Sequence, residues 1–423
     1  MSTMKRTRVA AAGLALAALV PVTLSAASTP ALAAVTAGPP ATATGSSFVM
    51  AGPSAVTAGR ATVRTGVPPI NAAALKRSIA GLPAADATAA EVRVGGSAGS
   101  WHGVAGITDL RTRRPAREGA RFRAGSITKI LTVSVVLQLV AEGKVSLDGT
   151  VQEYLPGLLP AGYPVITVGQ LLNHTSGLPA PTFDGGFERV YATRFEKVTP
   201  EEYVAEAVKN PIEFEPGTRQ HYLNINTFVA GLLIEKVTGR SYEREVTTRV
   251  LRPVGMRDSY LPGESVRIRG RHNHGYQTVP AGFPDAIRYG QGHVVDMTEG
   301  SATSTWASGD LISTTADLEK FIKALFRGKV VPAAQIEPMF TVPKVTMYGT
   351  GEPAVYTSGL TELKLPGGIT AYAKTGARYG SAAGVGATRD LSRTVVYSIN
   401  STDAKAAGQN ERGLGIALAA FAD

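Results

Sequence analysis

Residues 121–129 read Arg-Phe-Arg-Ala-Gly-Ser-Ile-Thr-Lys and lead directly into an apolar stretch that ends at Ala141. This stretch is apolar on nearly every face and is followed by Glu142 and Gly143, a pattern that predicts a buried helix with a glycine stop. Ser126 and Lys129 lie three residues apart, so on a helix they share one face and the lysine amine can lie beside the serine hydroxyl. The segment predicts the centre of the fold and a candidate nucleophile together.

Serine is a poor nucleophile at neutral pH and needs a neighbouring base. Burial and nearby positive charge push an amine towards its neutral form, so Lys129 can serve as that base. If Ser126 opens the helix, the positive end of the helix dipole also favours a developing oxyanion. The spacing alone is weak evidence, because Ser2 and Lys5 show it at the very start of the chain.

Two further short motifs are candidates for the same site. Tyr222-Leu223-Asn224 places a phenol and an amide two residues apart, just before a helical pattern from Thr227 to Val237. Lys374-Thr375-Gly376 lies at the end of a predicted strand and combines a cation, a hydroxyl and an unhindered backbone. Each tripeptide alone also has a structural interpretation, as a packed tyrosine with a turn asparagine or as a surface lysine before a glycine turn.

The order Ser-x-x-Lys, Tyr-x-Asn, Lys-Thr-Gly resembles that of the serine penicillin-recognising enzymes. The surrounding sequence is similar to the secreted D-alanyl-D-alanine carboxypeptidases and the class C β-lactamases. The resemblance covers residues 85 to 415 and implies a β-lactamase/transpeptidase-like fold. That fold is α/β (α+β), an antiparallel sheet flanked by helices with an inserted, mainly helical lobe. The similar blocks are residues 121–129, 137–148, 166–178, 214–217, 234–239 and 312–318.

The resemblance also implies roles for the matching residues. Ser126 would be the acylated nucleophile, and Lys129 and Tyr222 would share its proton transfers, with the identity of the resting base left open. Asn224 would bind the substrate's amide side chain, and Trp306 would border the substrate, although packing in the core would explain a tryptophan as well. The other implied binding groups are Lys374 for positive potential, Thr375 for a carboxylate, Gly376, and the backbone N–H of Ala377, which would form an oxyanion hole with that of Ser126.

Two positions separate this chain from the carboxypeptidases it resembles. Those enzymes hold the substrate carboxylate with an arginine on the strand before the third motif, and Thr361 stands at that place here. Threonine lacks the bidentate grip of a guanidinium. The third motif begins with Lys374, as in class C β-lactamases, where the closest carboxypeptidases have histidine. Either Lys374 and Thr375 bind the substrate carboxylate in this protein, or the substrate has no free carboxylate.

Strand patterns occur at both ends of the folded part, and helical or loop patterns dominate its middle to about residue 305. We therefore expect one sheet made from both chain ends, with a helical segment inserted and no second domain. The expected elements are strands at 90–94, 101–107, 369–374 and 394–399, the first two forming a hairpin, and a packed terminal helix at 413–422.

The N-terminus predicts export. Three basic residues, an uncharged run and Ala31-Leu32-Ala33 match a cleaved signal peptide over residues 1–33. Residues 34–69 are rich in Ala, Gly, Thr, Pro and Ser and predict a flexible linker, which leaves residues 70–423 as the catalytic domain. We expect a secreted monomer without an integral membrane segment after signal removal. Three of the ten net positive charges lie in the signal, and the remaining charge of about +7 favours association with the cell wall.

Several classes of protein are disfavoured. The chain has no cysteine, which excludes disulfides and thiolate chemistry. It lacks the metal motif HExxH, and His272-Asn273-His274 predicts an exposed polar turn, so we expect neither metal nor cofactor. His174 falls in a helix-end segment that the family uses structurally. Lysine and arginine are scattered singly along the sequence, which argues against nucleic acid as a partner.

The sequence thus predicts an acyl-enzyme-forming serine hydrolase acting on a peptide or small molecule. D-Alanyl-D-alanine carboxypeptidase action on cell-wall peptides is the first expectation. A β-lactamase, a carboxylic-ester hydrolase and a D-amino-acid amidase are alternatives that the same site would support. A non-catalytic wall-binding protein with this fold is the alternative from another class, and the complete set of motif residues argues against it.

Overall fold

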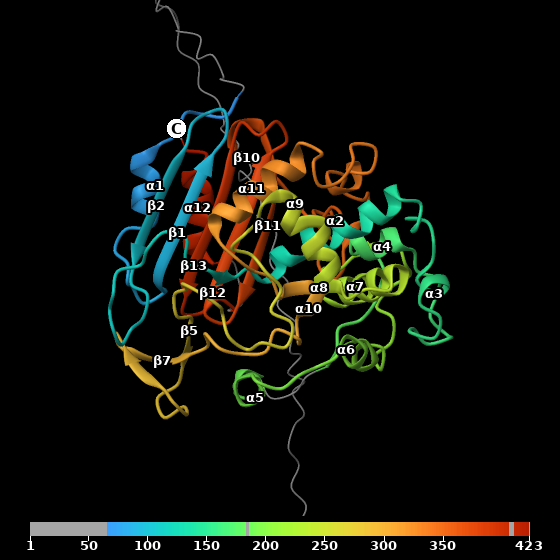
Figure 1. The fold of residues 1–423 in the computed structure, drawn as a ribbon, viewed down its shortest axis with the longest axis horizontal. Helices are drawn as coiled ribbons and strands as arrows, with labels where there is room; N and C mark the ends of the chain where they lie inside the picture. Colours follow the sequence, from blue (N-terminus) through green and yellow to red (C-terminus); the bar gives the residue numbers. More distant parts are fainter. Residues whose placement is uncertain (1–65, 183–185, 406–409, 423) are drawn as a thin grey trace, which may run out of the picture.

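The computed structural model describes residues 66–182, 186–405 and 410–422 (Figure 1). The predicted signal peptide and nearly all of the predicted linker lie outside these residues. Figure 1 shows the main sheet on the left and a mainly helical lobe on the right. One apolar cluster runs from the helices of the lobe onto the sheet, so the two parts share a core.

The main sheet has six antiparallel strands in the order β10-β11-β12-β13-β1-β2. Its pairing of β1 with β13 joins the two ends of the folded chain, with Val92 opposite Tyr397. The prediction of one sheet built from both ends is therefore confirmed. The strands are β1 (Ala87–Gly95), β2 (Trp101–Gly106), β10 (Thr361–Leu365), β11 (Ile369–Arg378), β12 (Ser381–Thr388) and β13 (Thr394–Ser401).

Both faces of this sheet are covered by helices. Because side chains alternate along a strand, Val396 of β13 joins the cluster that includes α11 (Thr315–Phe326), whereas Tyr397 joins the cluster that includes the terminal helices. These terminal helices, α1 (Ala72–Ser78) and α12 (Glu411–Ala419), pack against each other. The alternation explains why β12 and β13 are buried at every residue.

Two apolar helices, α2 (Thr128–Ala141) and α7 (Ile225–Thr238), form the centre of the lobe. The predicted helix at 127–141 is confirmed, and Gly143 follows it with a positive φ of 68°. No helix in the described part of the chain is long and apolar enough to cross a membrane. The other helices are α3 (Val151–Tyr154), α4 (Val168–Leu172), α5 (Gly186–Ala192), α6 (Pro200–Ala207), α8 (Tyr242–Val246), α9 (Arg252–Val254) and α10 (Trp306–Gly309), with 3-10 turns at Gly125–Ile127, Glu337–Met339 and Pro366–Gly368.

A small sheet in the middle of the chain was not predicted from the sequence. Its strands have the order β5-β7-β6, and each has only three to five residues with polar side chains among them, too few for a clear alternation. They are β5 (Tyr276–Val279), β6 (Ile287–Tyr289) and β7 (Gly292–Asp296). Short pairs also join β3 (Phe122–Arg123) to β8 (Ile312–Ser313) and β4 (Arg219–Gln220) to β9 (Thr346–Met347).

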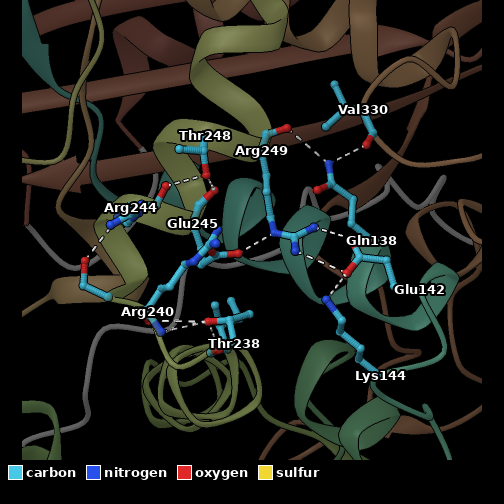
Figure 2. Close-up of polar contacts among 12 residues, drawn as sticks. Gln138, Glu142, Lys144, Thr238, Arg240, Arg244, Glu245, Thr248, Arg249 and Val330 are labelled. Carbon is cyan, nitrogen blue, oxygen red and sulfur yellow. Dashed lines mark hydrogen bonds and ion pairs between the residues drawn. The ribbon is translucent and has the colours of Figure 1, made fainter.

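The C-terminal end of α2 is fastened to the segment after α8 by Arg249 (Figure 2). The Arg249 guanidinium pairs with Glu142, which follows α2, and with Glu245 of α8. The Glu245 side chain is only 1% exposed, and its other cationic partner, Arg240, lies 3.6 Å away. Arg249 is therefore the main compensation for a buried negative charge.

Pro253 leaves a backbone carbonyl of this segment without its usual donor, and a side chain of α2 takes the place of that donor. Thr247–Leu251 forms a π-helical turn that runs into Pro253. Proline has no N–H, so it cannot donate to the carbonyl four residues earlier, which belongs to Arg249. The Gln138 side chain of α2 donates to that carbonyl at 3.3 Å and to the Val330 carbonyl at 2.6 Å. A gap left in the helix ladder is thus filled from α2 (Figure 2).

We predict that Arg249→Met lowers the free energy of unfolding by about 3 kcal/mol, because it leaves the Glu245 carboxylate buried without its partner. Lys144→Met is the matched control. Lys144 pairs with Glu142 at 2.8 Å on the surface, with half of its side chain exposed, so its loss should cost less than about 1 kcal/mol. Urea unfolding of both variants measures the difference, and equal stabilities would contradict the assignment.

The same pair makes stability depend on pH. The Arg249 guanidinium lowers the pKa of Glu142 to about 2. A carboxyl with a lowered folded-state pKa contributes stability above its unfolded pKa of about 4.3, and the contribution is lost as pH falls towards 2. In Arg249→Met only Lys144 still lowers the pKa of Glu142, so this part of the acid destabilisation should be smaller, as urea unfolding at a series of pH values would show.

Candidate active site

The nucleophile candidate sits on a tight turn between a short strand and α2. Ser126 lies in the 3-10 turn Gly125–Ile127, and α2 begins at Thr128. Gly125 has a positive φ of 54°, and the Thr128 hydroxyl donates to its carbonyl at 2.7 Å. Ser126 is partly exposed while its neighbours in the turn are buried, so a substrate can reach its hydroxyl.

Strand β11 approaches this turn so closely that only glycine fits on both sides. A Cβ on Gly376 would lie 1.9 Å from the Ala124 carbonyl oxygen and 2.9 Å from the Ser126 nitrogen. A Cβ on Gly125 would lie 2.6 Å from the Ala377 nitrogen. The backbone nitrogens of Ser126 and Ala377 therefore lie at the same contact, as an oxyanion hole requires.

Lys129 is fully buried one helical turn after the serine. Its Nζ lies 3.1 Å from Ser126 Oγ, 2.7 Å from Asn224 Oδ1 and 2.9 Å from the Ser308 carbonyl oxygen. Burial lowers the pKa of Lys129 well below its usual value, and the positive charges of Lys374 and Lys405 add to this effect. The amine is therefore driven towards its neutral form.

As an ammonium, Lys129 donates in all three contacts, and its lowered pKa favours loss of one of these protons. The Asn224 amide oxygen and the Ser308 carbonyl can only accept, so they take the two N–H bonds of a neutral NH₂ group. The lone pair is then left for the third contact, the O–H of Ser126. Lys129 is thus oriented to remove the serine proton directly.

Tyr222 lies close to both lysines of the site. Its ring centroid is 5.1 Å from Lys129 Nζ and 4.6 Å from Lys374 Nζ. Burial raises the pKa of Tyr222, and the nearby Ser126 hydroxyl opposes this only in part. The hydroxyl makes no hydrogen bond of regular geometry with the described residues. Tyr222 therefore rests as a phenol, and the neutral form is favoured for both Tyr222 and Lys129.

The third motif completes the arrangement from β11. Lys374 is 4% exposed, and its Nζ donates to the Thr375 carbonyl at 2.9 Å. Burial, together with the positive charge of Lys405, lowers the pKa of Lys374 to about 7. The side chain of Thr375 is partly exposed. The structure therefore brings together all three motifs that the sequence separated by about 250 residues.

Two residues have surroundings other than expected. Trp306 is 6% exposed, packs against Phe228 and Tyr242, and donates to Glu243 at 3.0 Å. It belongs to the core beneath the site, and it begins the short helix α10 whose Ser308 carbonyl accepts from Lys129. Trp306 therefore packs in the core, which was the alternative to the expectation that it borders the substrate.

His174 contributes more to the site than its helix-end position suggested. Its buried ring lies 4.6 Å from the ring of Tyr222, and its carbonyl accepts from the His221 N–H at 2.9 Å. The Asn226 amide lies 3.2 Å from its Nδ1. His174 thus fixes both the ring of Tyr222 and the backbone just before it. Its backbone φ of 63° is unusual for a non-glycine residue, and nothing in the sequence signals it.

Comparison with known proteins agrees with this geometry. Residues 64–418 match the Beta-lactamase family. The chain belongs to that family. This membership covers the sheet, the helical lobe and all three motifs, and it confirms the β-lactamase/transpeptidase-like fold.

Individual relatives carry different names. The esterase EstB of Burkholderia gladioli is 30% identical over 46% of this chain and 50% of its own length. The chain thus spans about half the length of this curated relative. The structure of a D-stereospecific amidohydrolase from Streptomyces sp. is 29% identical, covers 81% of this chain and 97% of its own, and has a TM-score of 0.70. An octameric penicillin-binding protein homologue from Pyrococcus abyssi is 27% identical over 75% of this chain and 70% of its own, with a TM-score of 0.61.

We predict that Lys129→Ala slows acylation at least about 100-fold, the usual scale for a positioned base. In the wild type, acylation should rise with pH as Lys129 loses its proton, because only the neutral amine accepts the serine proton. Tyr222→Phe should also slow acylation but should keep this rising limb. Stopped-flow acylation rates across pH measure both effects. Loss of the limb in Tyr222→Phe, with its retention in Lys129→Ala, would make the tyrosine the base.

Proposed function

We propose that the protein is a serine hydrolase that works through an acyl-enzyme on Ser126. As the Ser126 oxygen bonds to the substrate carbonyl carbon, its proton passes to Lys129 Nζ. The carbonyl oxygen takes the displaced electron pair and is stabilised by the N–H groups of Ser126 and Ala377. The leaving group departs with a proton that originates from Lys129, directly or through the Tyr222 hydroxyl. Water then hydrolyses the acyl-serine.

D-Alanyl-D-alanine carboxypeptidase action on cell-wall peptides remains our first proposal for the reaction. The observation that supports it is the pair of lysines close to the Tyr222 ring, next to the nucleophile. The charged groups that lower the pKa of Lys129 and Lys374 are themselves lysines, so the local potential is positive and suits a substrate with a free carboxylate. Relatives named as a D-stereospecific amidohydrolase and a penicillin-binding protein homologue fit this proposal.

Ester hydrolysis is the second candidate, and Thr361 favours it. Thr361 of β10 pairs with Ala373 of β11, directly beside Lys374. A guanidinium at this place would flank the third motif, and threonine offers no charge there. A relative named as an esterase fits this alternative.

Thr361→Arg distinguishes the two substrates. We predict that it raises kcat/KM for peptides ending in D-alanine by roughly tenfold to a hundredfold, because a charge-assisted contact to the carboxylate contributes about 1.5–3 kcal/mol. The rate on an uncharged short-chain ester should stay within about twofold, since the ester has no carboxylate. Thr361→Gln is the matched control, with similar bulk but no charge.

Lys374 gives a second readout in the same experiment. It is protonated below its pKa of about 7 and neutral above it. If it binds a carboxylate, the KM for the peptide should rise above pH 7 while the KM for the ester does not. A wild-type enzyme that hydrolyses the ester but not the peptide, with no gain from Thr361→Arg, would reject the carboxypeptidase and retain the esterase.

We further propose that the protein is exported after cleavage behind Ala33 and acts as a monomer. The N-terminal sequence supports export. Protein expressed with its own N-terminus should appear in the culture medium with Ala34 as its first residue, as N-terminal sequencing would show. Sedimentation should give a mass of one chain. Cell-retained, uncleaved protein would contradict the export proposal, and an octamer like that of the Pyrococcus abyssi homologue would contradict the monomer.

A further inference from the structure

Two loops outside the candidate site gather arginines that the sequence spreads over more than 150 residues. The first loop, between β2 and β3, contains Arg111, Arg113, Arg114 and Arg117. The second, residues 267–271, contains Arg267, Arg269 and Arg271. The loops lie side by side, since the Arg121 N–H donates to the Arg271 carbonyl at 2.8 Å and the His274 N–H donates to the Thr108 carbonyl at 2.7 Å. We call the seven arginines the arginine patch.

The side chains of the arginine patch are exposed, and few are neutralised. In the second loop the three arginines alternate with buried or glycine positions, so they face solvent together. Arg267 pairs with Glu299 at 3.2 Å. Within the described part of the chain, the other six make no ion pair with an acidic side chain. The patch is therefore a concentrated positive surface, although its arginines are scattered along the sequence.

The backbone of the first loop is held in place, so its arginines are presented in a fixed arrangement. The Thr108 N–H donates to the Arg114 carbonyl and the Arg113 N–H to the Asp109 carbonyl, both at 2.8 Å. The Tyr276 hydroxyl of β5 donates to the Asp109 carboxylate at 2.9 Å and accepts from the Leu110 N–H at 3.1 Å. A ligand would meet a preformed loop, which lowers the entropy cost of binding.

The chemistry of the arginine patch limits the class of partner that it can bind. Guanidinium groups bind phosphate through two parallel hydrogen bonds and are always charged, so arginines on adjacent loops suit a chain of repeating phosphates. Binding of single-stranded nucleic acid normally adds aromatic side chains on which bases stack. The aromatic groups here already have partners. Arg269 lies over the Tyr260 ring, the Tyr276 side chain is buried, and the rings of His272 and His274 stack on each other. The surface therefore fits phosphates without bases.

We propose that the arginine patch binds a linear phosphodiester polymer that carries no bases, of the polyol-phosphate type. The polymer would lie across both loops and exchange its counterions for the arginines. Such binding would hold the enzyme on an anionic polymer while leaving Ser126 and its neighbours free. The proposal does not depend on which substrate the site hydrolyses.

The test measures binding of the full chain to a glycerol-phosphate polymer of defined length by fluorescence anisotropy. The plot of log K against log salt should have a slope of about −3 if four arginines contact phosphates, at ~0.7 per contact. The patch variant combines Arg111→Gln, Arg113→Asn, Arg114→Gln and Arg117→Gln. Asparagine is used at position 113 because φ there is 51°, a conformation that asparagine tolerates. This variant should bind at least about tenfold more weakly, with a shallower slope that reflects the three remaining arginines of the second loop.

A matched control removes the same number of exposed charges elsewhere, by changing Lys76, Arg77, Arg327 and Lys329 to glutamine. Its affinity should stay within about twofold of the wild type, and equal losses in both variants would show that net charge rather than the patch is responsible. Thermal melting confirms that both variants are folded. Replacement of the four loop arginines by lysine should weaken binding while keeping the melting temperature, since lysine cannot form the double hydrogen bond.

Two further probes identify the class of partner. Single-stranded DNA with the same number of phosphates should bind no more tightly than the polyol phosphate. Vesicles of phosphatidylcholine and phosphatidylglycerol should bind more weakly at equal phosphate concentration. Preference for DNA or for vesicles, or absence of polymer binding at 50 mM salt in the wild type, would overturn the proposal.

Discussion

The contact between β11 and the turn that holds Ser126 is the constraint on which the rest of the site depends. Gly125 and Gly376 face this contact from the two sides, and a methyl group on either would collide with the opposing backbone. This spacing brings the nitrogens of Ser126 and Ala377 to the same contact. The contact also sets the depth of Lys129, because α2 starts within the same turn. Two glycines therefore position the oxyanion hole, the nucleophile and the base together.

Charge at the site is governed by burial rather than by ion pairing. Lys129 and Lys374 are both buried, and their shifted pKa values come from burial and from other positive charges. An arrangement of this kind is costly for two ammonium ions, which favours loss of a proton. The same environment keeps Tyr222 as a phenol. A neutral amine and a neutral phenol can pass a proton between serine and leaving group without creating an isolated buried charge.

Much of this arrangement could be predicted from the sequence, because it depends on short motifs and long apolar segments. Ser126 and Lys129 follow from helical spacing, and the order of the motifs indicated Tyr222 and Lys374. What could not be predicted depends on contacts between distant segments. The ring of His174 meets Tyr222 only after the chain folds, and the two arginine loops become neighbours through backbone hydrogen bonds. The small β5-β7-β6 sheet was missed because its strands are too short to show a period.

The order of strands in the main sheet has a consequence for how the molecule is made. Tyr397, which pairs with Val92, is synthesised roughly 300 residues later, so β1 has no partner in β13 until then. Pairings between such distant segments are slow to form, because a long loop must close first. β11, which completes the oxyanion hole, is also among the last strands to be synthesised. A chain still emerging from the ribosome thus has its serine and its lysine but no finished site, so the proposed hydrolytic activity would begin only when the polypeptide is nearly complete.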